Sequence, residues 1–176
     1  MEGRTYKLQP DKNLMRQGYY MADENGEIAY EAKVLKNPIF GAAQVDFINH
    51  KTGQTTQHKI GKVVTSSMST GIGGGLDFTD FLSIKSSYKY DGEKIWDYLH
   101  AQGVRLNSHM SSEKIGMTYE LSVKGQPIAT IASSTPKGKS MVTFSQVYDV
   151  TVADENIDMA FLVAFSIART EQVYYS

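Results

Sequence analysis

The sequence predicts a mainly β protein in which a closed antiparallel barrel surrounds a hydrophobic C-terminal helix, with one short helix outside the barrel. Two observations lead to this fold class. Short stretches rich in β-branched and aromatic residues alternate with turn signals along most of the 176 residues, as in a meander of hairpins. Residues 154–170 have instead the composition of a helix that is apolar on every side.

The apolar stretch is expected to be a buried core helix. Between Ile157 and Ala168 only Asp158 and Ser166 are polar, so the helix has no wide wet face. About 13 helical residues span roughly 20 Å, whereas a hydrocarbon core about 30 Å thick needs about 20 apolar residues. A transmembrane segment is therefore not expected. The side chains that build the predicted core helix are Ile157, Phe161, Leu162 and Phe165.

The ends of this helix carry capping signals. Asp154 or Asn156 can cap its start, because each has a short side-chain acceptor for free amide groups. Asp158 adds negative charge at the positive end of the helix dipole. Ser166 is expected to return its hydroxyl to the carbonyl of Leu162, one turn back, and so need not face water.

The strands are expected between turns marked by glycine, proline and asparagine. Asn25-Gly26 is the strongest hairpin signal, because both residues tolerate positive φ. The glycine- and serine-rich residues 66–77 read as a loop. The expected strands are residues 6–8, 19–22, 28–36, 42–49, 55–64, 81–90, 104–107, 117–123, 127–133, 141–150 and 172–175.

A short helix is expected at residues 93–102, stopped by Gly103. Its apolar face consists of Ile95, Trp96 and Leu99, which we expect to lie on a sheet. Asp91 is expected to cap this helix, and Glu93 to complement its dipole in the first turn.

Closure of the sheet follows from the apolar helix. An eight-stranded barrel is filled by its own side chains, and larger barrels leave a lumen. Because a helix with side chains is about 10–12 Å across, a closed sheet of eleven or twelve strands would hold it and remove exposed strand edges. The competing arrangement is a two-sheet sandwich with the helix at one end, which would leave one face of the helix exposed.

Composition excludes several classes of function. The length suits one domain, residues 1–176. A net charge of −1 lacks the basic footprint of a nucleic-acid binder. The absence of cysteine excludes disulfides, thiolate metal sites and a cysteine nucleophile. With no secretory signal in the first residues, a cytoplasmic location is expected.

The chemistry-bearing residues form no catalytic motif. Lys139-Ser140 lacks the spacing of a phosphate-binding loop, and no Gly-x-Ser-x-Gly occurs. Of the four histidines, only His50 and His58, with Asp46, suggest a metal site, and that site would be adventitious. We therefore expect no enzyme, no resident metal and no cofactor.

Four stretches together resemble a known family. They are residues 19–33 (YYMADENGEIAYEAK), 91–104 (DGEKIWDYLHAQGV), 119–132 (YELSVKGQPIATIA) and 154–169. Their order, with the apolar helix near the C-terminus, resembles the tubby C-terminal-like superfamily, in particular its bacterial and LURP-one-related branch. The resemblance implies a twelve-stranded barrel around a central helix. It also implies a binding or scaffold module whose ligand is a phosphoinositide, another anionic lipid headgroup or a protein partner.

The lipid-binding residues of that family cannot be placed here one by one. The nearest candidates are Lys59, Lys62, Lys85 and Lys89. The chain is slightly acidic and lacks the basic surplus of a strong membrane-surface binder. Two alternatives stay open: an enzyme with a surface cleft beside the loop at residues 66–80, and a switch in which the apolar helix leaves its barrel.

Overall fold

The computed structural model describes residues 3–11, 18–36, 43–67, 83–110, 116–133, 147–153 and 157–166. The mainly β content predicted from the sequence is confirmed. The strands are β1 (Arg4–Asp11), β2 (Gly18–Ala22), β3 (Ile28–Lys36), β4 (Ala43–Asn49), β5 (Gln54–Ser67), β6 (Ser83–Tyr90), β7 (Glu93–Lys94), β8 (Val104–Met110), β9 (Met117–Val123), β10 (Gln126–Ser133) and β11 (Tyr148–Val152). A short helix, α1 (Ile95–Ala101), joins β7 to β8, and residues 159–166 form the C-terminal helix.

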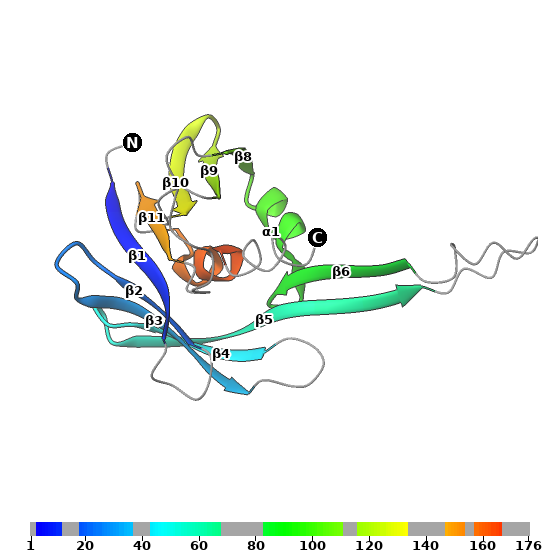
Figure 1. The fold of residues 1–176 in the computed structure, drawn as a ribbon, viewed down its shortest axis with the longest axis horizontal. Coiled ribbons are helices and arrows are strands. Elements are labelled where there is room, and N and C mark those ends of the chain that lie inside the picture. The colour runs from blue at the N-terminus through cyan, green and yellow to red at the C-terminus, as the bar shows by residue number, and fades with distance from the viewer. Residues whose placement is uncertain are drawn as a thin grey trace, which may run out of the picture.

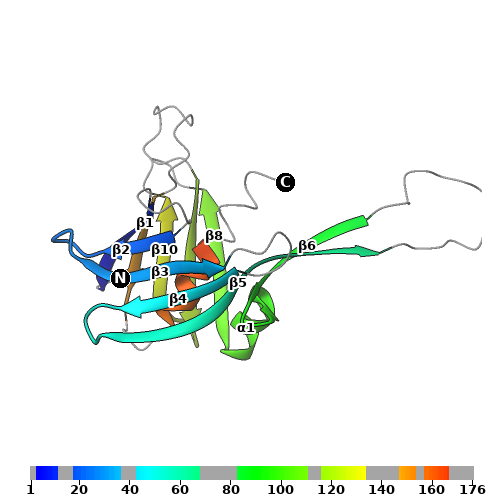
Figure 2. The same ribbon diagram turned by 90° about the horizontal axis from the view of Figure 1, so that it is seen from below.

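The strands form one 11-stranded antiparallel sheet in the order β7-β6-β5-β4-β3-β2-β1-β11-β10-β9-β8. This order consists of two meanders, β1 to β7 and β8 to β11, which meet where β1 pairs with β11. Tyr6 of β1 lies opposite Val150 of β11, and both side chains are buried. The sheet curls around the C-terminal helix (Figures 1 and 2). Its inner face carries the buried side chains, and alternate residues point to the outer face.

The described part of the C-terminal helix is buried along its whole length. No residue of 159–166 is more than 6% exposed. Phe161 and Phe165 are buried with Leu162, whereas Ile157, just before the helix, is half-buried. Phe161 packs edge-on against Tyr90 of β6, and Phe165 packs edge-on against Tyr119 of β9. The helix therefore contacts both meanders.

Asp158 caps this helix. Its Oδ1 accepts the Phe161 N–H at 3.0 Å, three residues on, as an N-cap side chain does. The N-cap of this helix is therefore Asp158, and the prediction of Asp154 or Asn156 as its cap is wrong. Residues 154–156 themselves lie outside the described ranges. The expected bond from the Ser166 hydroxyl to the carbonyl oxygen of Leu162 is present at 2.8 Å.

The predicted closed barrel of about twelve strands is wrong. The sheet has eleven strands, and its order ends at β7 and β8, which do not pair with each other. β7 is two residues long and leads directly into α1, so it offers β8 no ladder. The short, peripheral α1 contacts β6, β7 and β8 instead, and its Tyr98 stacks on Phe161 with ring centroids 4.4 Å apart. Because the curled sheet and α1 together cover the apolar helix, closure of the sheet is not needed to keep it dry.

The segment before α1 also differs from expectation. Asp91 and Gly92 have φ angles of 49° and 91°, so they form the two-residue turn of the β6–β7 hairpin. Asp91 is thus not a helix cap, and Glu93 belongs to β7 rather than to the first helical turn. Lys94 occupies the N-cap position without a side-chain hydrogen bond.

The apolar face predicted for α1 holds only in part. Ile95 and Leu99 are buried, but Trp96 is 45% exposed. The strand predicted at residues 141–150 corresponds to β11, whereas residues 141–146 and the strand predicted at 172–175 lie outside the described ranges. Beyond the body of the sheet, β5 and β6 continue as a two-stranded ribbon (Figure 2).

Candidate functional site

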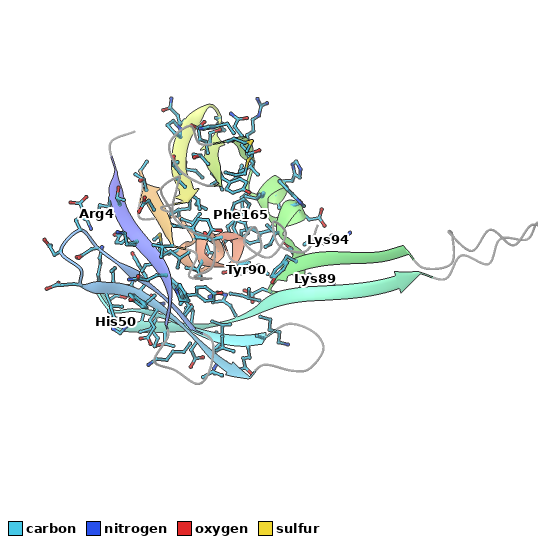
Figure 3. All side chains as sticks on the ribbon, in the orientation of Figure 1. Arg4, His50, Lys89, Tyr90, Lys94 and Phe165 are labelled. Carbon is cyan, nitrogen blue, oxygen red and sulfur yellow. The ribbon has the colours of Figure 1, made fainter. Side chains whose placement is uncertain are left out.

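Three lysines lie on the outer face where β5, β6 and β7 adjoin. Lys89 stands between the buried Tyr88 and Tyr90, so alternation along β6 turns it outward. Lys59 likewise stands between two inward-facing residues of β5. Lys94 pairs directly with Lys89 across the β6–β7 ladder and therefore shares its face (Figure 3). We call Lys59, Lys89 and Lys94 the lysine face.

The register places two like charges side by side. Directly opposed residues of an antiparallel pair have Cα atoms about 4.5–5.5 Å apart, and like charges there destabilise the pairing. On its other side, Lys89 pairs with Gly61 of β5. Gly61 has no side chain that could cover the ammonium group of Lys89. Among the described residues, no carboxylate forms an ion pair with any of the three lysines. An anion can therefore bind to the opposed ammonium groups of Lys89 and Lys94, although the Asp91 carboxylate lies beside Lys59, whose backbone N–H it accepts.

The structure brings together only part of the predicted lysine set. Lys89 pairs with Gly61, so Lys59 lies diagonally across from it, two residues along β5. Lys62 pairs with Tyr88 and Lys85 with Thr65, further along the ribbon. The side chains of Lys62 and Lys85 lie outside the described part of the structure. Sequence reasoning missed Lys94. The segment KYDGEK around Asp91-Gly92 contained the signal, since a two-residue Asp-Gly turn sets the residues before and after it opposite each other.

A second polar group, formed by the inner face of β5 and the β6–β7 turn, links three residues in a row. His58 Nδ1 lies 2.7 Å from Asp91 Oδ2, and His58 Nε2 lies 2.8 Å from the Thr56 hydroxyl. Asp91 Oδ1 accepts the backbone N–H of Lys59 at 2.7 Å, which fixes the carboxylate. The imidazole stacks on Tyr90 with ring centroids 5.2 Å apart. The row has the order carboxylate, imidazole, hydroxyl.

Asp158 joins β6 and α1 to the start of the C-terminal helix. Its Oδ2 accepts hydrogen bonds from the hydroxyls of Tyr90, at 2.9 Å, and Tyr98, at 2.8 Å. Burial raises the pKa of Tyr90 far above 10.0, and the negative charge of Asp158 and its hydrogen bond raise it further. Burial also raises the pKa of Tyr98, followed by the hydrogen bond to Asp158. Both tyrosines therefore stay neutral hydrogen-bond donors to the carboxylate at physiological pH.

A cavity of about 240 Å³ lies between the start of the C-terminal helix and the inner faces of β3, β4 and β5. The wall of this cavity includes His58, from the Asp91–His58–Thr56 row, and Asp158, the acceptor of the two tyrosine hydroxyls. Its lining residues are Tyr30, Phe47, Asn49, Gln54, Thr56, His58, Ile157, Asp158, Met159 and Ala160.

A wider hollow of about 680 Å³ lies on the outer face over β1 and the β2–β3 hairpin. Of its described lining residues, Asp23, Glu24, Glu31 and Asp149 are acidic and Lys7 alone is basic. Asp23 Oδ1 accepts hydrogen bonds from the backbone N–H groups of residues 25 and 27, so this carboxylate stabilises the β2–β3 turn. The surplus of negative charge makes this hollow unsuited to an anionic ligand.

The histidines do not form the adventitious metal site. His50 bonds Glu31 at 3.1 Å, while His58 faces Asp91 and Thr56, so the two rings have different partners. Within the described ranges, no three His, Cys, Asp or Glu side chains gather as metal ligands would. The cleft predicted beside the glycine-rich loop falls mostly on residues 68–82, outside the described ranges.

Comparison with protein-family models, with curated proteins and with solved structures finds no match. Within the ranges that the structure describes, no helix has both the length and the apolar character needed to cross a bilayer.

Proposed function

We propose that the protein is a non-enzymatic binding module that holds a phosphate-bearing anionic surface, such as the headgroups of an acidic membrane, on the lysine face. The observation that carries the proposal is the direct opposition of Lys89 and Lys94, with Lys59 beside them and no ion pair among the described residues. A bound anion would relieve the repulsion between the opposed ammonium groups.

The expected attachment is weak and sensitive to salt. A lysine near an acidic membrane contributes about 1 kcal/mol, so three lysines supply about 3 kcal/mol. The net charge of −1 adds no general attraction, so binding depends on where the lysines lie. The cysteine-free composition fits the cytoplasm, where the membrane leaflet is acidic.

This proposal does not rest on the tubby-like resemblance. That kinship stays a prediction, and the open sheet removes the barrel that it implied. A protein partner with an acidic surface would use the same lysines, and it would bind in the absence of vesicles.

Co-sedimentation with vesicles tests the proposal. The wild type should pellet with vesicles that contain phosphatidylserine or a phosphoinositide, and not with phosphatidylcholine alone, at low salt. Lys89→Gln with Lys94→Gln should lower the affinity by about 30-fold, from about 1 kcal/mol per lysine. The control is Lys33→Gln with Lys124→Gln, which removes the same charge from elsewhere on the surface. An equal loss in both double variants, or no binding at low salt, would contradict the proposal.

A second candidate function, hydrolysis of small esters, is favoured by the row of Asp91, His58 and Thr56. With its proton on Nδ1, donated to Asp91, His58 accepts the hydroxyl proton of Thr56 at Nε2 as a general base. The Thr56 oxygen would attack the ester carbonyl, and the imidazolium would return the proton to the leaving alcohol. Water would then release the acid by the same route.

Turnover of p-nitrophenyl acetate distinguishes this candidate from a pure binding module. Thr56→Val should abolish any turnover above that of free imidazole, whereas Thr55→Val, the next residue along the strand, should not. Equal rates in the two variants, or no turnover by the wild type, would exclude the hydrolase.

A further inference from the structure

Among the residues that the structure describes, the wall of the cavity beside the C-terminal helix contains one carboxylate and no ammonium or guanidinium group. Asp158 accepts hydrogen bonds from two tyrosine hydroxyls and one backbone N–H, all of which are uncharged. No ion pair of Asp158 is present among the described residues. Its charge is therefore stabilised but not neutralised, and it would repel an anion that entered the cavity.

Aromatic rings form the wall contributed by β3 and β4. Tyr30 and Phe47 stack with centroids 5.7 Å apart and an interplanar angle of 15°, and the edge of His58 meets Phe47. A cation over an aromatic face is attracted by the ring electrons. These aromatic rings already hold one cation, because Lys51 Nζ lies 5.0 Å from the ring centroid of Tyr6, to whose hydroxyl it donates, and 5.7 Å from that of Tyr30. Phe47 is therefore the ring whose face is left for a ligand. Lys51 itself does not line the cavity.

The volume limits the ligand. A cavity of about 150 Å³ holds benzene, so one of about 240 Å³ accommodates roughly ten non-hydrogen atoms. A metal ion is disfavoured, because the described residues provide no cluster of three ligands. Thr56 and Gln54 offer hydrogen bonds to a polar end of the ligand.

We propose that this cavity binds a small organic cation, an alkylated ammonium compound of about ten or fewer non-hydrogen atoms, between Asp158 and the Tyr30–Phe47 stack. The cation supplies the positive charge that Asp158 lacks, and its alkyl groups contact the rings. The cavity and the lysine face use different residues on opposite faces of the sheet. The inference therefore stands or falls independently of vesicle binding.

Choline chloride is the test ligand, and 3,3-dimethylbutan-1-ol, in which carbon replaces the charged nitrogen, is its neutral match. Calorimetric titration should show saturable binding of choline and at least tenfold weaker binding of the neutral alcohol. Phe47→Leu, which keeps an apolar side chain but removes the ring, should weaken choline binding by about 2- to 30-fold. Trp96→Leu removes an exposed ring on α1, outside the cavity, and should leave choline binding unchanged.

Several outcomes would overturn the inference. These are no saturable binding of choline, equal binding of the neutral alcohol, and a loss of binding in Trp96→Leu but not in Phe47→Leu. If Phe47→Leu does not fold, amide NMR of the wild type decides instead. Choline-induced shifts at Thr56, His58 and Met159 would support the site, and shifts confined to other residues would contradict it.

Discussion

Removal of the Asp158 side chain should destabilise the protein more than the loss of any other surface-accessible acid described here. In Asp158→Ala the N-cap bond to the Phe161 amide is lost, which costs about 1 kcal/mol. The hydroxyls of Tyr90 and Tyr98 lose their shared acceptor as well. Hydrogen bonds to a charged group are worth about 1.5–3 kcal/mol when well buried, and Tyr98 is only half-buried. We expect a total loss of about 3–4 kcal/mol.

Urea unfolding followed by circular dichroism measures this loss, with Asp97→Ala in the exposed first turn of α1 as the control. The control should cost less than about 1 kcal/mol, the range of a dipole effect. A double-mutant cycle of Asp158→Ala with Tyr90→Phe should give a coupling free energy of about 1–2 kcal/mol. A free energy of unfolding for Asp158→Ala within about 0.5 kcal/mol of that of the control, which is the scatter of additive mutants, would show that Asp158 does not join the helix to β6 and α1.

Three further predictions follow from the same contacts. Because the pKa of Tyr90 is raised in the folded protein, the unfolded chain loses the Tyr90 proton at a lower pH than the folded protein does. The contribution of Tyr90 to the free energy of unfolding should therefore be constant below about pH 10 and fall above it by about 1.4 kcal/mol per pH unit. Alkaline melting curves of Tyr90→Phe should lack that part of the slope, and an identical slope would contradict the assignment. Phe165→Ala should cost about 3–5 kcal/mol and Ile157→Ala clearly less, because Phe165 is fully buried and Ile157 is not; equal melting temperatures would contradict the packing. Gly92→Ala should cost about 1–2 kcal/mol through its φ of 91° alone, since nothing lies within 4 Å of an added Cβ, and a wild-type melting temperature would show that the turn tolerates a side chain.

Local patterns predicted the elements of this fold better than their arrangement. The apolar run before Ser166 identified the buried helix, because the burial of a whole helix is visible in its own composition. Closure of the sheet could not be predicted from the composition of one segment, since it depends on whether β7 and β8 pair with each other. In the structure α1 lies between them. The same limit applies to the cap, because Asp154, Asn156 and Asp158 all have suitable side chains.

The candidate sites were harder to predict because their residues are distant in sequence. His58 and Asp91 are 33 residues apart, and Tyr90 and Asp158 are 68 apart. No periodicity connects such pairs in one sequence. The opposition of Lys89 and Lys94 is different, since it follows from the two-residue turn between them, and it was missed only because Asp91 was interpreted as a helix cap.

The lysine face is tested most directly by amide NMR spectra of the wild type titrated with inorganic pyrophosphate at low salt. Saturable shifts that centre on Lys59, Lys89 and Lys94, and that disappear on addition of salt, are the predicted result. Shifts spread evenly over all the surface lysines, or centred on a region outside β5 to β7, would contradict the proposal that this face binds anions.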